Sequence, residues 1–164
     1  MKWFLVIPGI LVCLVLIIVI IGYLLPVKHT SSVQVSVPAS PAETWARLAD
    51  FSSYPLWRKD VKSVNVSSSV EWVEVNARGD SLPLKIVVLD PGQRLVTKIQ
   101  GHGLPFGGGW EFRLKDNGGS TIVTITENGE VYNPLFRFVS KFIMGHDATL
   151  RKYAGFLERS FQKG

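Results

Sequence analysis

The protein has 164 residues, of which 46% are hydrophobic and 19% are charged, and its formal net charge is +5. This length fits one globular domain, and the composition excludes a collagen, a disulfide-rich scaffold, a coiled coil, a repeat array and a disordered chain. The modest charge, without a sheet motif that combines aromatic and basic residues, also argues against nucleic-acid binding.

The first 27 residues differ in composition from the rest of the chain. Trp3 to Leu25 is a run of 23 residues without a charge. A helix of this length is about 34 Å long, enough to cross a hydrocarbon core of about 30 Å. We therefore predict that residues 1–27 form an uncleaved, single-pass membrane anchor. The main alternative is a cleaved signal peptide, whose apolar region is shorter and ends at a small-x-small site that this run lacks.

The boundary between the anchor and the soluble part carries few charges. The amino terminus and Lys2 precede the run and Lys28 follows it. This bias favours an extracytoplasmic position for the soluble domain. Residues 28–32 are expected to form a short polar linker, and residues 33–162 to form the domain.

The domain begins with signals for a strand and then a helix. Val33, Val35 and Val37 alternate with polar residues, which is typical of a half-buried strand. Ser40-Pro41-Ala42-Glu43 fits a capping box with proline at the first helical position, so a helix is predicted from there to about Asp50. The aromatic-rich stretch from Phe51 to Trp57 predicts a turn or a short helix.

A series of strands is predicted next, separated by glycine-containing turns about ten residues apart, which indicates a meandering antiparallel sheet. The expected strands are Val61–Val66, Val70–Val75, Leu84–Leu89, Leu95–Ile99, Trp110–Leu114 and Thr121–Thr126. The inward face of the second of these is left open, because either Trp72 and Glu74 or Val73 and Val75 can point to the core.

The last segment, Pro134 to Gln162, has apolar residues at helical spacing and predicts one long amphipathic helix, with a kink or break at Gly145. The basic residues on its other face suit solvent or anionic lipid headgroups. An α+β arrangement follows, in which a curved antiparallel sheet of about seven strands wraps the C-terminal helix and buries the apolar face of both.

Particular segments carry a family resemblance. Val35–Trp45 reads as a strand, Pro-Ala-Ser-Pro and a helix with an aromatic residue, and Asp50–Trp57 adds Asp-Phe and Tyr-Pro-Leu-Trp. Gly129–Phe138 looks like the start of the last helix in membrane-anchored members. Together they resemble the START-like, or polyketide cyclase/dehydrase-like, superfamily with a helix-grip fold, over roughly residues 33–160. The resemblance implies an apolar cavity between the sheet and the last helix. Members bind hydrophobic molecules or lipids, and only some are enzymes.

Few residues are candidates for catalysis. Metal-binding and nucleophile motifs are absent from the sequence, so neither a metal nor a cofactor is expected. His102 lies in the glycine-rich stretch Gly101–Gly109, which is either a plain hairpin loop or a mobile lid over a cavity. His146 lies on the apolar stripe of the last helix, as a core residue or a pocket residue. Glu74 is either solvated or, if it points inward, a candidate general base.

Aromatic residues are the better candidates for contacting a ligand. The predicted cavity walls are Trp57, Trp72, Phe106, Trp110, Phe138 and Phe142. The first hypothesis is a membrane-tethered domain that binds a hydrophobic small molecule or a lipid. The second is a cyclase/dehydrase-type enzyme that uses a pocket histidine or Glu74. The third is an interaction domain whose cavity has collapsed into a packed core. The oligomeric state is left open.

Overall fold

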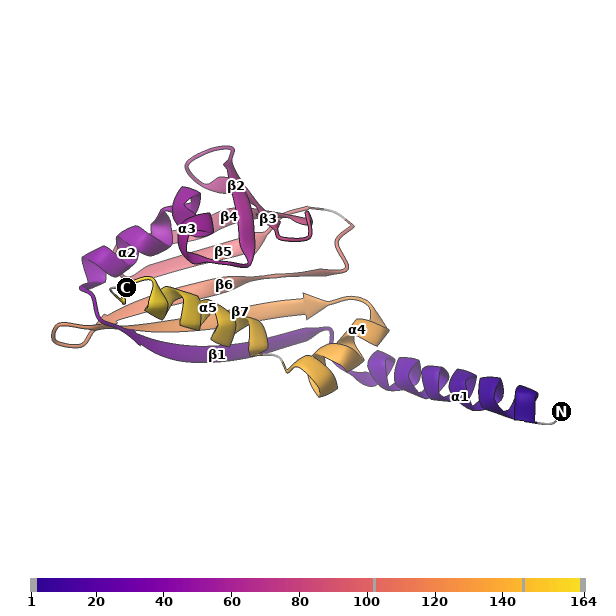
Figure 1. Cartoon of the computed structure of the whole chain (residues 1–164). Coiled ribbons are helices and arrows are strands. Elements are labelled where there is room, and N and C mark those ends of the chain that lie inside the picture. Colours follow the sequence, from indigo (N-terminus) through magenta and orange to yellow (C-terminus); the bar gives the residue numbers. More distant parts are fainter. Residues whose placement is uncertain (1–2, 102, 146, 163–164) are drawn as a thin grey trace.

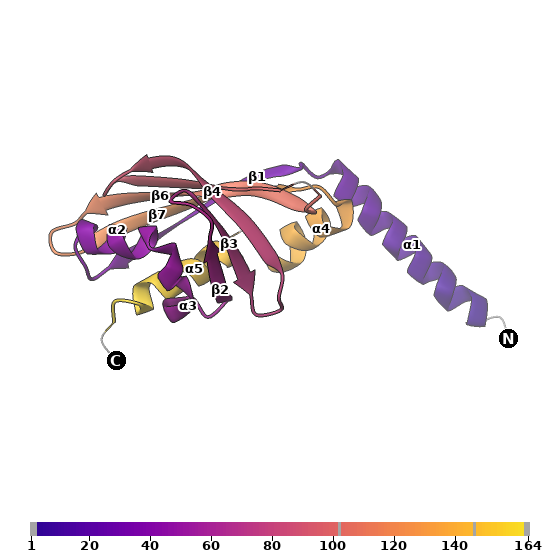
Figure 2. The same cartoon turned by 90° about the horizontal axis from the view of Figure 1, so that it is seen from above.

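A computed structural model describes residues 3–101, 103–145 and 147–162 of the chain. The strands are β1 (Lys28–Val37), β2 (Val61–Val66), β3 (Glu71–Asn76), β4 (Ser81–Asp90), β5 (Arg94–Ile99), β6 (Phe106–Asp116) and β7 (Thr121–Val131). They form one antiparallel sheet in the order β1-β7-β6-β5-β4-β3-β2, so β2 to β7 form a meander and β1 closes its far edge. The helices are α1 (Trp3–Leu24), α2 (Pro41–Ala49), α3 (Tyr54–Trp57), α4 (Pro134–Val139) and α5 (Ala148–Arg159). Figures 1 and 2 show α2, α3 and α5 on one side of this curved sheet. The predicted α+β helix-grip architecture is confirmed.

Strand β1 is longer than the sequence pattern predicted. It pairs with β7 from Lys28, opposite Glu130, to Val37, opposite Thr121. Residues 28–32 therefore form the first half of this strand, and the prediction of a linker there was wrong. The reason is the length of β7, which extends to Val131 and offers backbone partners to this polar stretch.

The connection between β1 and β2 crosses the concave face of the sheet. Helix α2 begins with the predicted capping box, in which the Glu43 backbone N–H donates to Ser40 Oγ and the Ser40 backbone N–H donates to Glu43 Oε2. A 3₁₀ turn (η1, Phe51–Ser53) leads into α3, and the buried Tyr54 hydroxyl donates to the Leu48 carbonyl at 2.8 Å. The side chains buried most completely around these elements form the core, namely Val37, Leu48, Leu95, Val123, Ile125, Leu150 and Leu157.

The predicted long C-terminal helix is two helices. After α4 the backbone forms a π-helical turn (η2, Ser140–Met144), and Gly145, whose φ of 78° lies outside the helical region, ends it before α5 begins. Helix α5 packs against β1 and β7, whereas α4 packs mainly against α1. The apolar periodicity runs through both parts because α4 also has an apolar partner, the end of α1.

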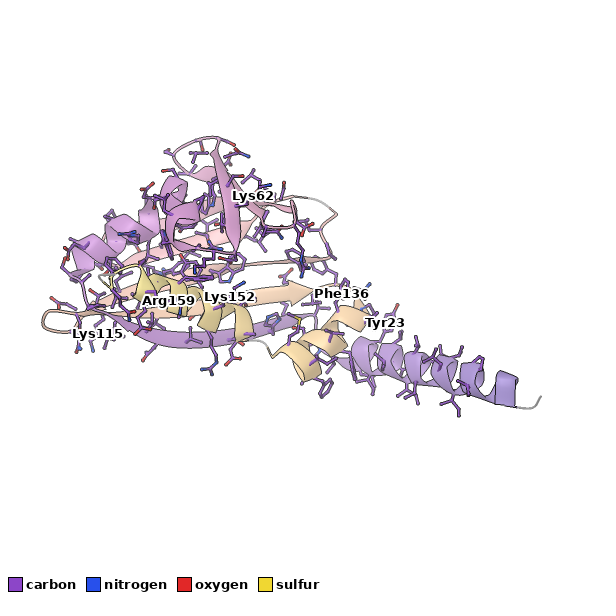
Figure 3. The ribbon with its side chains drawn as sticks, in the orientation of Figure 1. Tyr23, Lys62, Lys115, Phe136, Lys152 and Arg159 are labelled. Carbon is purple, nitrogen blue, oxygen red and sulfur yellow. The ribbon has the colours of Figure 1, made fainter. Side chains whose placement is uncertain are left out.

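Helix α1 leaves the domain at the end where α4 lies, as Figure 1 shows. Its segment Ile7–Leu24 is long and apolar enough to cross a membrane and is almost entirely exposed. In Figure 3 the side chains of Tyr23 and Phe136 lie at this same end of the molecule, whereas Lys115 lies at the opposite end.

Candidate functional site

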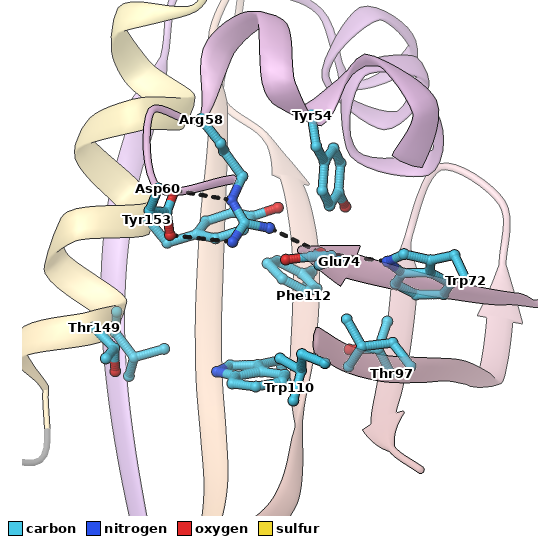
Figure 4. A pocket seen from close by; sticks show the side chains of 13 residues that line it. Tyr54, Arg58, Asp60, Trp72, Glu74, Thr97, Trp110, Phe112, Thr149 and Tyr153 are labelled. Atoms are coloured by element: carbon cyan, nitrogen blue, oxygen red, sulfur yellow. Dashed lines mark hydrogen bonds and ion pairs between the residues drawn. The ribbon is translucent and has the colours of Figure 1, made fainter. Parts of the chain in front are cut away.

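A pocket of about 210 Å³ lies between α5 and the concave face of the sheet (Figure 4). Side chains from α3, the turn after it, strands β3 to β6 and α5 surround it. They are Tyr54, Arg58, Asp60, Trp72, Glu74, Leu82, Leu84, Thr97, Trp110, Phe112, Thr149, Leu150 and Tyr153. One end of this set is charged, and the other is aromatic and aliphatic.

Arg58 organises the charged end. Its Nη1 donates to Glu74 Oε1 at 3.0 Å, and its Nη2 donates to Asp60 Oδ2 at 3.2 Å (Figure 4). The Trp72 indole N–H also donates to Glu74 Oε1, at 3.3 Å. Burial lowers the pKa of the Arg58 guanidinium, but attraction from Glu74, Tyr153 and Asp60 outweighs this and leaves that pKa raised. In the charged end, the positive charge of Arg58 is therefore balanced by two carboxylates, and their polar groups lie beside the apolar walls of the pocket.

Two tyrosines enclose the guanidinium. Arg58 Cζ lies 5.0 Å from the Tyr54 ring centroid and 4.9 Å from that of Tyr153, which is cation–π distance. Burial raises the pKa of Tyr153 to about 12 and raises that of Tyr54 well above its usual value. The buried Tyr153 hydroxyl makes no hydrogen bond of good geometry within the part of the chain that the structure describes, and its polar neighbour, the Tyr54 hydroxyl, already donates to Leu48. Since a buried polar group without a partner is unfavourable, this hydroxyl is suited to accept a partner from a bound molecule.

The apolar end is formed by the sheet and one residue of α5. Trp72 is 2% exposed, and its ring stacks on Phe51 with centroids 3.7 Å apart. Leu84, Phe112 and Leu150 are similarly buried. These walls provide a surface that favours an apolar ligand because binding would remove its apolar area from water.

A second pocket of about 280 Å³ adjoins the first and extends toward α4 and η2. The two share Leu82, Trp110 and Thr149 in their walls. Glu127 on β7 ties two of these together, because its Oε2 accepts from the Trp110 indole N–H and from the Thr149 hydroxyl, each at 3.0 Å. The second pocket reaches Ser140, Met144 and Gly145 at the η2 turn.

The structure places the predicted ligand residues in three different environments. Trp72 and Trp110 line the first pocket, and Trp110 and Phe106 line the second. Trp57 is instead a core residue, with edge-on ring contacts to Tyr54 and Tyr153. Phe138 and Phe142 pack on each other outside both pockets, on α4 and η2. Phe142 therefore does not join Trp72 and Trp110 in the walls of the first pocket.

The three catalytic candidates fare differently. Glu74 points inward together with Trp72, which resolves the open question about this strand, and it is 7% exposed. His102 and His146 lie outside the described residues. Within the described ranges, no group of three or more His, Cys, Asp or Glu side chains is arranged to hold a metal.

Part of the glycine-rich stretch that was expected to be a hairpin loop or a lid belongs to a strand. Residues 106–109 belong to β6, and a side chain at Gly108 or Gly109 would overlap the carbonyl oxygen of Asn128 or Thr97 on the neighbouring strands. These two glycines allow the strands to approach each other closely, so this part of the stretch is not free to act as a loop.

Sequence reasoning missed Arg58, Asp60, Tyr54 and Tyr153. Arg58 and Asp60 follow α3 in a stretch without periodicity, and their role depends on Glu74, 16 residues away along the chain. Tyr153 lies on the predicted apolar stripe of the last helix, so the pattern indicated its burial but not its hydroxyl.

Comparison with known proteins agrees with this architecture. Residues 28–159 match the family described as polyketide cyclase / dehydrase and lipid transport. None of the curated proteins matches the chain. Solved structures with the same fold include a START superfamily protein from Mycobacterium smegmatis, which is 20% identical with a TM-score of 0.65 over 81% of this chain and 97% of that one.

Two further solved structures have the same fold at lower sequence identity. A conserved protein from Geobacillus kaustophilus is 16% identical, with a TM-score of 0.66 over 81% of this chain and 95% of that one. Norcoclaurine synthase from Thalictrum flavum is 12% identical, with a TM-score of 0.63 over 82% of this chain and 86% of that one. At these identities the likeness concerns the fold alone.

Proposed function

The chain belongs to the polyketide cyclase / dehydrase and lipid transport family, and on that basis we propose that it is a membrane-tethered binding protein for a hydrophobic small molecule or part of a lipid. The ligand would occupy the pocket between α5 and the sheet. The observation that carries this proposal is the juxtaposition of apolar walls at Trp72, Leu84 and Phe112 with the buried hydroxyl of Tyr153, which makes no hydrogen bond of good geometry among the described residues.

The chemistry of the pocket suggests a ligand with an apolar body and one polar group. Desolvation of the body against the aromatic and aliphatic walls would supply most of the affinity. The polar group would lie near Arg58 and Tyr153, where it can exchange hydrogen bonds with a guanidinium or a phenol. A carbonyl, hydroxyl or carboxylate meets this requirement.

The volume limits the size of the ligand. A dry apolar cavity of about 150 Å³ is enough to hold benzene, whereas pockets for drug-sized molecules occupy about 300–1,000 Å³. The first pocket, at about 210 Å³, suits a compound of one or two rings or a short part of an acyl chain. A longer ligand would also need the adjoining 280 Å³ beyond Trp110.

The tether would be α1, whose uncharged segment Ile7–Leu24 meets the requirements of a membrane span. Strand β1 begins four residues after α1 ends, so the domain would lie directly at the bilayer surface. Hydrophobic compounds partition into bilayers, and a binding domain held there would meet them at a raised local concentration.

A proton-transfer enzyme is the second candidate, because Glu74 and Tyr153 line the same pocket. Glu74 is already engaged by Arg58 and Trp72, which suits a structural carboxylate better than a free base. Incubation of the captured compound with the protein separates the two functions. A binding protein returns the compound unchanged, whereas an enzyme converts it, and Glu74→Gln would then stop conversion while binding persists.

Extraction of the full-length protein tests the proposed function. The chain is purified in a mild detergent and analysed by native mass spectrometry, and bound molecules are then released with organic solvent and identified. We expect a small hydrophobic compound in stoichiometric amount. Protein that is always empty, and that binds no member of a panel of hydrophobic compounds, would refute the proposal.

A further inference from the structure

An exposed apolar surface lies on the segment between β7 and α5. We call it the α4–η2 surface; its members are Leu135 (42% exposed), Phe136 (51%), Phe142 (58%), Ile143 (71%) and Met144 (60%). Five large apolar side chains within ten residues are unusual on a surface that faces water, because monomeric soluble proteins rarely expose such clusters. The surface therefore calls for an apolar partner.

The α4–η2 surface is continuous with the end of the apolar helix α1. A side chain at Gly22 would overlap the backbone carbonyl of Pro134, so the two helices touch backbone to backbone at this point. Arg137 Nη1 donates to the carbonyls of Gly22 and Leu25, each at 3.1 Å, and thereby caps the C-terminal end of α1. These contacts fix α4 against the last turn of α1.

The position of this joint along α1 sets the depth of α4. Gly22 lies three residues before the end of the apolar run at Leu25, which corresponds to about 4.5 Å of helix. If α1 spans the bilayer, α4 lies at the boundary between acyl chains and headgroups. Figure 1 shows α4 and η2 crossing the domain end of α1 rather than continuing along it.

The charges of the segment fit the same location. Residues 134–145 contain two basic residues, Arg137 and Lys141, and no acidic one. Tyr23, 68% exposed, lies at the same end of the molecule (Figure 3). Tyrosine is enriched at membrane interfaces, and an apolar face bordered by basic residues is typical of segments that lie in the headgroup region of anionic membranes.

We propose that the α4–η2 surface is a second membrane-contact site that inserts its apolar side chains into the headgroup–acyl boundary of an anionic bilayer. This inference rests on the tether in the proposed function, since α1 supplies the reference depth. One end of the second pocket would then face the bilayer, because Met144, which is part of the surface, and Gly145 line that pocket. The route from bilayer to binding pocket would then pass Trp110.

Spin-label depth measurements on the full chain test this site. The native cysteine is replaced by Cys13→Ser, and single nitroxides are attached at Ile143→Cys, at Val15→Cys within α1, and at Leu56→Cys. Leu56 is the matched control, because it is an apolar residue that is 85% exposed and lies on α3, away from α1. Proteins are reconstituted in vesicles of phosphatidylcholine and phosphatidylglycerol, and collision rates with oxygen and with a water-soluble nickel chelate are compared.

The three labels separate the possible outcomes. We expect the Val15 and Ile143 labels to favour oxygen by several-fold over the control, with Val15 deeper than Ile143. A lipid-exposed Val15 label with a water-exposed Ile143 label would overturn the second contact and leave the tether intact. A water-exposed Val15 label would refute the tether and the second contact with it. An Ile143 label shielded from both reagents, with spin–spin broadening, would show that a second copy covers the surface, and would also overturn the proposal.

Discussion

Arg58 and Glu74 form an ion pair inside the pocket, with Arg58 Nη1 donating to Glu74 Oε1 at 3.0 Å while the two side chains remain only 11% and 9% exposed. Each residue has one further partner of its own, Asp60 for Arg58 and the Trp72 indole for Glu74. The two partners are unequal, because Asp60 is a charged carboxylate whereas Trp72 offers a single neutral N–H. The consequences of removing either member of the pair should therefore also be unequal.

The first prediction concerns that asymmetry. Arg58→Met should lower the free energy of unfolding by about 3–5 kcal/mol, because it leaves a buried carboxylate with only a neutral donor. Glu74→Gln should lower it by about 1–3 kcal/mol, since Arg58 keeps Asp60 and the amide oxygen can still accept. Urea titration of the full chain in detergent measures both values. The double variant Arg58→Met/Glu74→Leu should recover much of the loss, and equal losses in the two single variants would contradict the account.

The second prediction concerns the two pocket tyrosines. Tyr153→Phe should leave the free energy of unfolding unchanged or slightly raised, because the hydroxyl it removes makes no hydrogen bond of good geometry among the described residues. Tyr54→Phe, its matched control, should lower that free energy by about 0.5–1.5 kcal/mol, because the hydrogen bond to the Leu48 carbonyl is lost. Binding of 2-naphthol, a small aromatic phenol, should weaken about two- to tenfold in Tyr153→Phe. If Tyr153→Phe destabilises the protein as much as Tyr54→Phe, the hydroxyl has a structural partner and the idea fails.

The third prediction concerns alkaline pH. The pKa of Tyr153 is raised to about 12 by burial, against about 10 in an unfolded chain. Below pH 10 both states hold the proton and the full stability is present. Between pH 10 and 12 the unfolded state ionises first, so the free energy of unfolding should fall by roughly 2–3 kcal/mol from this group. Tyr153→Phe should show a smaller decrease between pH 9 and pH 11 in urea titrations, and an identical decrease in both proteins would exclude this assignment.

The fourth prediction concerns the joint between α1 and α4. Gly22→Ala should displace α4, because the new methyl group would overlap the backbone carbonyl of Pro134, which cannot rotate away. Gly9→Ala is the matched control, since its methyl group would meet nothing within 4 Å. Distances between nitroxides at Leu24→Cys and Leu56→Cys, in the Cys13→Ser background, should become broader only in Gly22→Ala. Unchanged distributions in both variants would show that the joint is not rigid in the way described.

Much of the fold follows from local patterns. Apolar patterns together with the turns between them predicted every strand of the sheet in its core part, and Ser40 with Glu43 predicted the start of α2. These features depend on neighbours in sequence, so periodicity and capping chemistry are enough to find them. The ends of the strands were harder to predict, because they depend on pairing with a distant segment. Strands β1 and β6 both pair with β7 along their whole length.

The candidate site depended on contacts between distant residues. The pattern around Glu74 allowed either face of β3 to point inward, and the ion pair with Arg58 is what makes an inward carboxylate tolerable. Phe138 and Phe142 have the spacing of core residues but lie outside the first pocket, because Gly145 ends their helical segment before α5 begins. A helical period does not say which apolar surface a helix will meet.

Occupancy of the pocket between α5 and the sheet is the central claim, and calorimetric titration of 2-naphthol into the full chain in detergent micelles tests it most directly. Protein-free micelles correct for partitioning. Leu84→Trp should fill the pocket, whereas Val87→Trp, at a residue of the same strand that is 50% exposed, should leave it open. We predict saturable binding at one site in the wild type and in Val87→Trp, and loss of binding in Leu84→Trp. Equal binding by the two variants, or no saturable binding by the wild type, would contradict the account.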